Sequence, residues 1–250
     1  MKSNSAAVLS LTLLAGLLAA APARADDAAP ACDVPAYLLT TESALPKVAD
    51  ALKTGRPLDI LVVGSRSSTI NTTDGSAYPG RLQAVLHDKL PSVTVNVSVE
   101  IQAKKTAEEV ASGLAKLVEG KRPTLVIWQT GTYDAMRSID PDDFRGAVDE
   151  GVAALQNAGT DVILMNLQYS PRTETMISAP PYLDNMRVVA QQHDVPLFDR
   201  FAIMRHWNDA GDFDLFSASH GLELAKRVHD CLGRALSKFV IDAAHPAQQN

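Results

Sequence analysis

The stretch LDILVV, residues 58–63, followed by Gly64, decides the fold. A short β-branched apolar run of this kind is typical of a strand that is buried on both faces of a parallel sheet. Similar runs recur along the chain and alternate with segments whose apolar residues have helical spacing. The expected strands are residues 58–63, 93–99, 124–128, 161–167 and 196–198, and the expected helices are residues 78–90, 105–118, 141–157, 180–193, 199–208 and 221–239. This alternation predicts an α/β fold with a parallel sheet of about five strands and helices on both faces.

Composition narrows the class of protein. The chain has 250 residues, of which 46% are hydrophobic, and a formal net charge of -6. An acidic balance argues against a nucleic-acid partner, because phosphate binding requires a basic patch. The sequence has neither a phosphate-binding glycine motif nor a metal-ligand spacing, so we expect no cofactor and no metal. Nothing in it indicates an oligomeric state.

The first residues have the pattern of an export signal. Lys2 precedes the apolar run AAVLSLTLLAGLLAA at residues 6–20, and Ala23 and Ala25 frame an A-x-A cleavage site. We therefore predict a signal peptide over residues 1–25, cleaved after Ala25, and a periplasmic or secreted protein. Residues 26–250 then form a single domain, and no later stretch is apolar enough to cross a membrane.

Export would place both cysteines of the chain in an oxidising compartment. Cys32 lies near the mature N-terminus and Cys231 lies in the last expected helix. Two cysteines allow one intramolecular pairing, so we predict a Cys32–Cys231 disulfide that joins the N-terminal arm to the C-terminal helix.

Ligands of parallel α/β sheets bind at the carboxyl ends of the strands, so the loops that follow the strands are the candidate site. The loop after the first strand begins GSRSS and includes Ser65 and Ser67. A serine there could be a nucleophile if a histidine reaches it. Serines are equally typical of hydrogen-bonded turns and helix caps, which is the alternative interpretation.

Six segments resemble those of the SGNH/GDSL hydrolases. They are the GSRSS loop, YPGRLQAVL, TLVIWQTGT, DVILMNLQYSPR, PLFDRFAIMRHW and GLELAKRVHDCLGRAL. The resemblance covers about residues 32–240 and is greatest to exported members from alphaproteobacteria. It implies a flavodoxin-like three-layer α/β/α sandwich and a relation to esterases, lipases and carbohydrate deacetylases. Members use a serine nucleophile, an Asp-x-x-His pair, and Gly and Asn oxyanion donors.

The four catalytic blocks of that family differ here at their key residues. Arg66 stands at the nucleophile position, and the segment VEIQAKK at residues 99–105 lacks the expected glycine. Tyr133 replaces the Asn, and His220 and Glu223 stand at the Asp and His positions. Arginine cannot attack a carbonyl, and a glutamate is a poor substitute for imidazole near neutral pH. An Arg66–Glu223 ion pair could instead cross the cleft.

Three hypotheses follow, and they leave open whether the chain is an enzyme. In the first, the protein is catalytically degenerate and binds an envelope ligand, such as an acidic or acylated glycan, through Ser65, Arg66, Ser67, Tyr133, His220 and Glu223. In the second, it is an active esterase or deacetylase whose first loop is shifted by one residue. Ser67 is then the nucleophile and His220 the base, oriented by Asp214, Asp212 or Glu223. In the third, it is a structural envelope protein without a small ligand.

Overall fold

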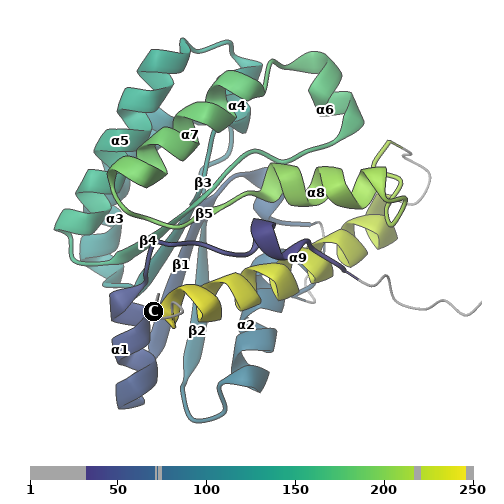
Figure 1. Ribbon diagram of the computed structural model, residues 1–250. Coiled ribbons are helices and arrows are strands. Elements are labelled where there is room, and N and C mark those ends of the chain that lie inside the picture. Colours follow the sequence, from purple (N-terminus) through teal and green to yellow (C-terminus); the bar gives the residue numbers. More distant parts are fainter. Residues whose placement is uncertain (1–31, 71, 73–74, 217–220, 246–250) are drawn as a thin grey trace, which may run out of the picture.

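The structure is a computed structural model that describes residues 32–70, 72, 75–216 and 221–245, and it has three layers (Figure 1). A parallel five-stranded sheet with the order β2-β1-β3-β4-β5 forms the middle layer. The strands are β1 (Leu58–Gly64), β2 (Val95–Ile101), β3 (Leu125–Gln129), β4 (Asp161–Met165) and β5 (Leu197–Phe198). The α/β fold and the parallel sheet of five strands expected from the sequence are confirmed.

Helices cover both faces of the sheet. On one face α3 packs against α5 and α5 against α7, and on the other α9 packs against α2 and α1 (Figure 1). The nine helices of the described residues are α1 (Pro46–Thr54), α2 (Tyr78–Lys89), α3 (Ala107–Lys121), α4 (Thr132–Met136), α5 (Pro141–Asn157), α6 (Pro171–Met176), α7 (Pro180–Gln192), α8 (Arg200–Asp209) and α9 (Gly221–Ala244). Two short 3-10 helices, η1 (Ala36–Leu38) and η2 (Arg66–Ser68), complete the elements.

The central strands form the core because they are covered on both faces. Every residue of β3 and β4 is buried, as is every residue of β1 except Asp59, which is half-buried. In contrast, β2 is an edge strand, and its Val99 and Ile101 are each 38% exposed. The nearly continuous burial of β1 thus matches the apolar run that predicted it, whereas β2 is buried only at Val95.

Two close contacts in the helical layers depend on glycine. Gly151 of α5 faces Trp128 of β3, and a Cβ at that position would lie 2.3 Å from the indole Cζ3. Gly233 of α9 faces α2, where a Cβ would lie 2.5 Å from the Cβ of Arg81. Both glycines bring a helix nearer to its neighbour than any other residue allows.

Some expected boundaries were wrong by a few residues. Strand β2 spans Val95–Ile101 rather than residues 93–99, because Leu90 to Thr94 form a turn that ends where the Leu58 amide donates to the Thr94 carbonyl at 2.8 Å. Helix α3 begins at Ala107 rather than residue 105, because Thr106 and Glu109 form a capping box at its start. Helix α9 continues to Ala244, beyond the expected end at residue 239.

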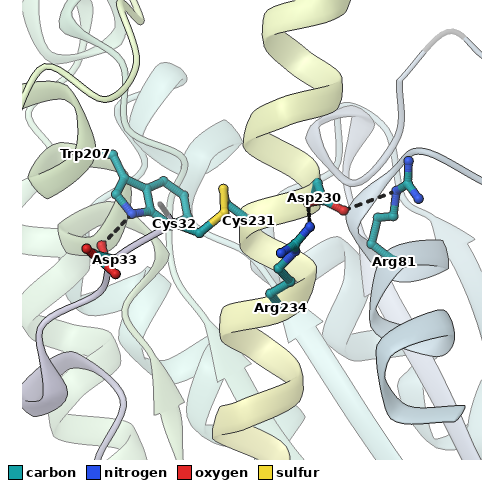
Figure 2. Close-up of a disulfide and its surroundings, with 7 residues drawn as sticks. All are labelled: Cys32, Asp33, Arg81, Trp207, Asp230, Cys231 and Arg234. Atoms are coloured by element: carbon teal, nitrogen blue, oxygen red, sulfur yellow. Dashed lines mark hydrogen bonds and ion pairs between the residues drawn. A yellow bond between two sulfur atoms is a disulfide. The ribbon is translucent and has the colours of Figure 1, made fainter. Parts of the chain in front are cut away.

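The N-terminal arm is fastened to the C-terminal helix (Figure 2). Cys32 and Cys231 form the disulfide expected from the sequence, with a sequence separation of 199 residues. The Trp207 indole Nε1 donates to the Asp33 carbonyl at 2.8 Å beside it, and the Leu45 amide donates to the Ala243 carbonyl at 3.0 Å further along the arm. The arm therefore adds covalent and hydrogen-bonded links between the two ends of the described chain.

No helix among the described residues is long and apolar enough to span a membrane. The expected signal peptide, residues 1–25, lies outside the described residues.

Candidate functional site

The chain turns sharply at the carboxyl end of β1. Gly64 ends the strand, and a Cβ there would lie 2.1 Å from the Ser68 hydroxyl oxygen, so only glycine leaves room for this turn. The Ser65 side chain then caps η2 by accepting a hydrogen bond from the Ser67 amide at 3.3 Å. The structure therefore shows the capping role, which was one of the two sequence-based alternatives for these serines.

Gln129, the last residue of β3, connects this loop to the rest of the cleft. Its side-chain Nε2 donates to the hydroxyls of Ser67 at 2.7 Å and Ser65 at 3.1 Å. Its Oε1 accepts from the Ser68 hydroxyl at 2.6 Å and from the Tyr78 hydroxyl at 3.3 Å. We call these five residues together with Arg200 the Gln129 network. All of its hydroxyl oxygens are within hydrogen-bond distance of another member.

Arg200, the first residue of α8, is the charged member of the network and is 0% exposed. Its Nη1 donates to the Ser67 hydroxyl at 3.1 Å and to Gln129 Oε1 at 3.0 Å. Its Nη2 donates to the Ser67 carbonyl at 3.1 Å and to Gln168 Oε1 at 3.4 Å, and its Nε is buried without a partner. All of these acceptors are neutral, and no carboxylate of the described residues forms an ion pair with Arg200. Desolvation therefore lowers the pKa of Arg200 to about 10.

The described histidine nearest to the network is His229 of α9, which is 6% exposed. Its Nδ1 accepts the backbone N–H of Tyr78 at 2.9 Å, so the ring proton of the neutral imidazole lies on Nε2. Burial, and secondarily the positive charge of Arg200, lowers the pKa of His229 to about 3. Burial likewise raises the pKa of the Tyr78 hydroxyl. His229 is thus neutral at physiological pH, and its only basic nitrogen is already occupied.

Arg66 and Glu223 do not form the ion pair that was considered from the sequence. Arg66 is exposed, and the Glu223 side chain is 75% exposed and pairs with Lys226 at 3.6 Å. Among the described ion pairs none joins Arg66 to Glu223, so the hypothesis of an ion pair across the cleft was wrong. Each side chain is hydrated instead, which costs less than burying the pair.

The structure describes two of the other candidate residues, Asp214 and Tyr133, but not His220. His220 lies outside the described residues, so the structure does not show whether it reaches Ser67. Asp214 accepts the backbone N–H of Phe216 at 3.1 Å, within the segment that leads toward α9. Tyr133 is half-buried in α4, and the Arg137 guanidinium lies 5.8 Å from its ring centroid.

Two cavities adjoin the network. The first, at the ends of β1 and β3, is bounded by Ser65, Gln129, Gly131 and Tyr133 and holds about 20 Å³. One water molecule needs about 10–15 Å³, so this cavity is too small for a substrate group. The second measures about 200 Å³ and borders Arg200.

The second cavity combines a polar end with apolar walls. Its polar residues include Gln168, Arg200 and His229, and its apolar residues include Met204, Leu215, Leu224 and Val228. The described residues contain no group of three or more His, Cys, Asp or Glu side chains that could hold a metal ion. The polar end and the apolar walls of this cavity suit an organic ligand that has one polar group.

Sequence reasoning missed most of the network. Ser68, Tyr78, Gln129 and Arg200 were not candidates, and neither was the neighbouring His229. One signal was available: Arg200 comes two residues after the apolar PLF run and just before Phe201, where a charge is unexpected unless the fold gives it a role.

The fold is shared with solved esterases of low sequence identity. The psychrotrophic esterase EstA from Pseudoalteromonas sp. is 16% identical, with a TM-score of 0.57 over 73% of this chain and 98% of EstA. AlinE4, an SGNH-hydrolase family esterase, is 18% identical, with a TM-score of 0.53 over 64% of this chain and 83% of AlinE4. A variant of Axe2, an acetyl-xylooligosaccharide esterase from Geobacillus, is 14% identical, with a TM-score of 0.59 over 74% of this chain and 94% of Axe2.

These likenesses establish the flavodoxin-like three-layer sandwich of SGNH hydrolases, which the resemblance in the sequence implied. No curated protein matches the chain by sequence. The model of the Non-GDSL lipase-like family, however, matches residues 31–246, a range that includes every residue that the structure describes. The chain belongs to the Non-GDSL lipase-like family.

Proposed function

We propose that this family member binds a ligand in the cleft at its strand ends and does not hydrolyse esters through a Ser–His–Asp triad. The observation that carries the proposal is the environment of Ser67, the candidate nucleophile. Its hydroxyl oxygen lies 2.7 Å from Gln129 Nε2 and 3.1 Å from Arg200 Nη1, and both of these atoms are donors. Among the described residues, no imidazole is within hydrogen-bond distance of it.

A serine nucleophile must give up its proton to a base when it attacks. The Ser65 hydroxyl, 3.1 Å from the Ser67 hydroxyl, is a nearby acceptor but is not a base. His229 is not one either, because its Nδ1 accepts the Tyr78 amide and its pKa is lowered to about 3. The donors around Ser67 would stabilise an alkoxide on its own oxygen, but the described residues supply no base that forms the alkoxide.

The usual catalytic positions support the same interpretation. Arg66, at the nucleophile position of the resemblance, is exposed and cannot act as a nucleophile. Glu223, at the histidine position, is largely exposed and paired with Lys226. Tyr133, at the oxyanion Asn position, borders the cavity of only about 20 Å³. Catalytic degeneracy is therefore our proposal for this cleft.

We infer that the ligand belongs to the cell envelope and is an acidic or acylated glycan. The Cys32–Cys231 disulfide supports a location outside the cytoplasm, because disulfides persist in oxidising compartments. On this proposal, residues 1–25 are a signal peptide that is cleaved after Ala25, and residues 26–250 are one exported domain.

The second candidate function is an active esterase that uses Ser67 and His220, with Asp214 as the orienting acid. One observation favours it: the Ser67 hydroxyl is half-buried at the carboxyl end of β1, beside the donors Gln129 and Arg200. Such donors are what an oxyanion needs.

Ester hydrolysis separates the two functions. We would measure hydrolysis of p-nitrophenyl acetate and butyrate by the purified protein and by Ser67→Ala, with Ser112→Ala as the control. Ser112 is an exposed serine on α3, remote in sequence from the network. The proposal predicts equal background rates for all three proteins. A wild-type rate that Ser67→Ala and His220→Ala abolish, and Ser112→Ala leaves intact, would overturn it in favour of the esterase.

A panel of acetylated and acidic glycans tests the binding half of the proposal. A ligand that binds the folded state raises the melting temperature, and the rise grows with the ligand concentration. A concentration-dependent rise with at least one glycan is expected. No rise with any of them would favour a structural envelope protein instead.

A further inference from the structure

The guanidinium of Arg200 is a buried positive charge to which the described part of the chain offers no counter-ion. It is fully shielded from solvent, and every acceptor that it contacts is a neutral oxygen of Ser67, Gln129 or Gln168. The Tyr78 ring, whose centroid lies 5.6 Å from the guanidinium carbon, adds only the weak attraction of an aromatic face. A buried charge is costly unless it is paired, so this site favours an anion that the described residues do not provide.

The cavity of about 200 Å³ lies against this charge. Gln168 belongs both to its wall and to the hydrogen-bond partners of Arg200, and its contact with Nη2, at 3.4 Å, is the longest of the four. A carboxylate in the place of the Gln168 amide would convert a long neutral hydrogen bond into a short charge-assisted one. Gln168 is half-buried and lies in the loop between β4 and α6. Its side chain is therefore the hydrogen-bond partner of Arg200 that is most easily displaced.

A second donor borders the same cavity. His229 accepts the Tyr78 amide through Nδ1, so the proton of its neutral ring is on Nε2. His229 also lines the cavity, and a ligand there meets a neutral N–H donor in addition to the guanidinium. Both donors suit an acceptor with two oxygens, and neither accepts a proton from it.

The rest of the wall selects against a bare inorganic anion. Met204, Leu215, Leu224 and Val228 line the cavity away from its polar residues. A phosphate or sulfate would leave this apolar surface without a partner, whereas an acyl chain of a few carbons would cover it. The volume is below the range of about 300–1,000 Å³ that is typical of drug-sized ligands, so the chain is short.

We propose that this cavity binds the carboxylate of a small organic acid with a short apolar chain, anchored by Arg200 after Gln168 has moved aside. The inference rests on the proposed function and names the chemical class that the cleft accepts. A free acid and the acidic end of a larger envelope molecule present the same carboxylate to this cavity.

Titration calorimetry with sodium hexanoate tests the assignment, with 1-hexanol and sodium phosphate as the uncharged and the chainless probes. We expect hexanoate to bind at least tenfold more tightly than either of the others. Equal affinity for hexanol would overturn the role of the charge, and equal affinity for phosphate would overturn the role of the apolar wall. Absence of hexanoate binding would overturn the proposal as a whole.

Gln168→Glu is the decisive variant, because it places a carboxylate of the protein where the carboxylate of the ligand is expected. It should weaken hexanoate binding at least tenfold and raise the melting temperature of the ligand-free protein, since it neutralises Arg200 from within. Gln191→Glu, on the exposed surface of α7, adds the same charge and should change neither quantity. If Gln168→Glu binds hexanoate as tightly as the wild type does, the anchor is not Arg200.

The two proposals fail in distinguishable ways. Ester hydrolysis that depends on Ser67, with hexanoate binding intact in Ser67→Ala, would overturn the proposed function alone. Absence of both hydrolysis and hexanoate binding would overturn the carboxylate assignment alone.

Discussion

His229 should make the protein sensitive to mild acid. Its pKa is lowered to about 3 in the folded protein, whereas an unfolded histidine has a pKa of about 6.5. Between these values the unfolded chain binds a proton that the folded chain does not, so the free energy of unfolding falls as the pH falls. At pH 4.5 the unfolded imidazole is almost fully protonated, and linkage predicts a loss of about 2.5 kcal/mol relative to pH 7.

The variant His229→Asn removes this titration and keeps an acceptor, because the Asn Oδ1 can replace Nδ1 as the partner of the Tyr78 amide. Urea denaturation at pH 7 and pH 4.5 gives the loss of stability for each protein, and carboxylate titrations contribute equally to both. The difference between the two losses should be about 2.5 kcal/mol in favour of the variant. His87→Asn, at a side chain that is 74% exposed, is the control and should lose as much as the wild type. Equal losses in the wild type and His229→Asn would refute the assignment of a buried neutral imidazole.

Three further variants test the packing and the cross-link. Cys32→Ser in combination with Cys231→Ser opens a loop of 199 residues, and chain entropy predicts a loss of at most about 5 kcal/mol in urea denaturation; an unchanged midpoint would contradict this. Asp134→Asn should raise the melting temperature at pH 7, because burial raises the pKa of that carboxyl and one of its oxygens is buried without a partner; a lower melting temperature would show that the charge is needed. Gly151→Ala forces a methyl group against Trp128 and should cost about 1–3 kcal/mol, whereas full stability would mean that α5 can move outward.

The strands and the long helices were predictable because their signals are local. The strands β1, β3 and β4 are apolar runs, and α5 begins with Asp140, whose side chain caps the helix, followed by Pro141. Helix α1 was not expected, and its start explains why. Leu45 offers no side-chain cap, and the amides of Lys47 and Val48 donate instead to Asp161 Oδ2, each at 2.9 Å. A cap supplied from more than a hundred residues away leaves no mark on the local sequence.

The candidate site was likewise predictable only where its signal was local. The position of the cleft followed from the strand ends, and the serines of the first loop do lie there. The Gln129 network was not predictable, because its members come from the β1 loop, β3, α2 and α8, and only the folded sheet brings them together. Comparison of family motifs also cannot show that Arg66 and Glu223 both point toward solvent, since that depends on the conformation of each loop.

The Cys32–Cys231 disulfide joins two residues that are synthesised at different times. Cys32 leaves the ribosome 199 residues ahead of Cys231, which is about 10–40 s at ordinary rates of synthesis. During that interval Cys32 has no cysteine partner within its own chain. Cys231 is 1% exposed beside the α2–α9 contact, so an oxidant reaches its thiol more easily before the last helix has docked than afterwards. A chain that ends before the last helix also lacks Cys231, and its Cys32 then has no cysteine to pair with in the same molecule.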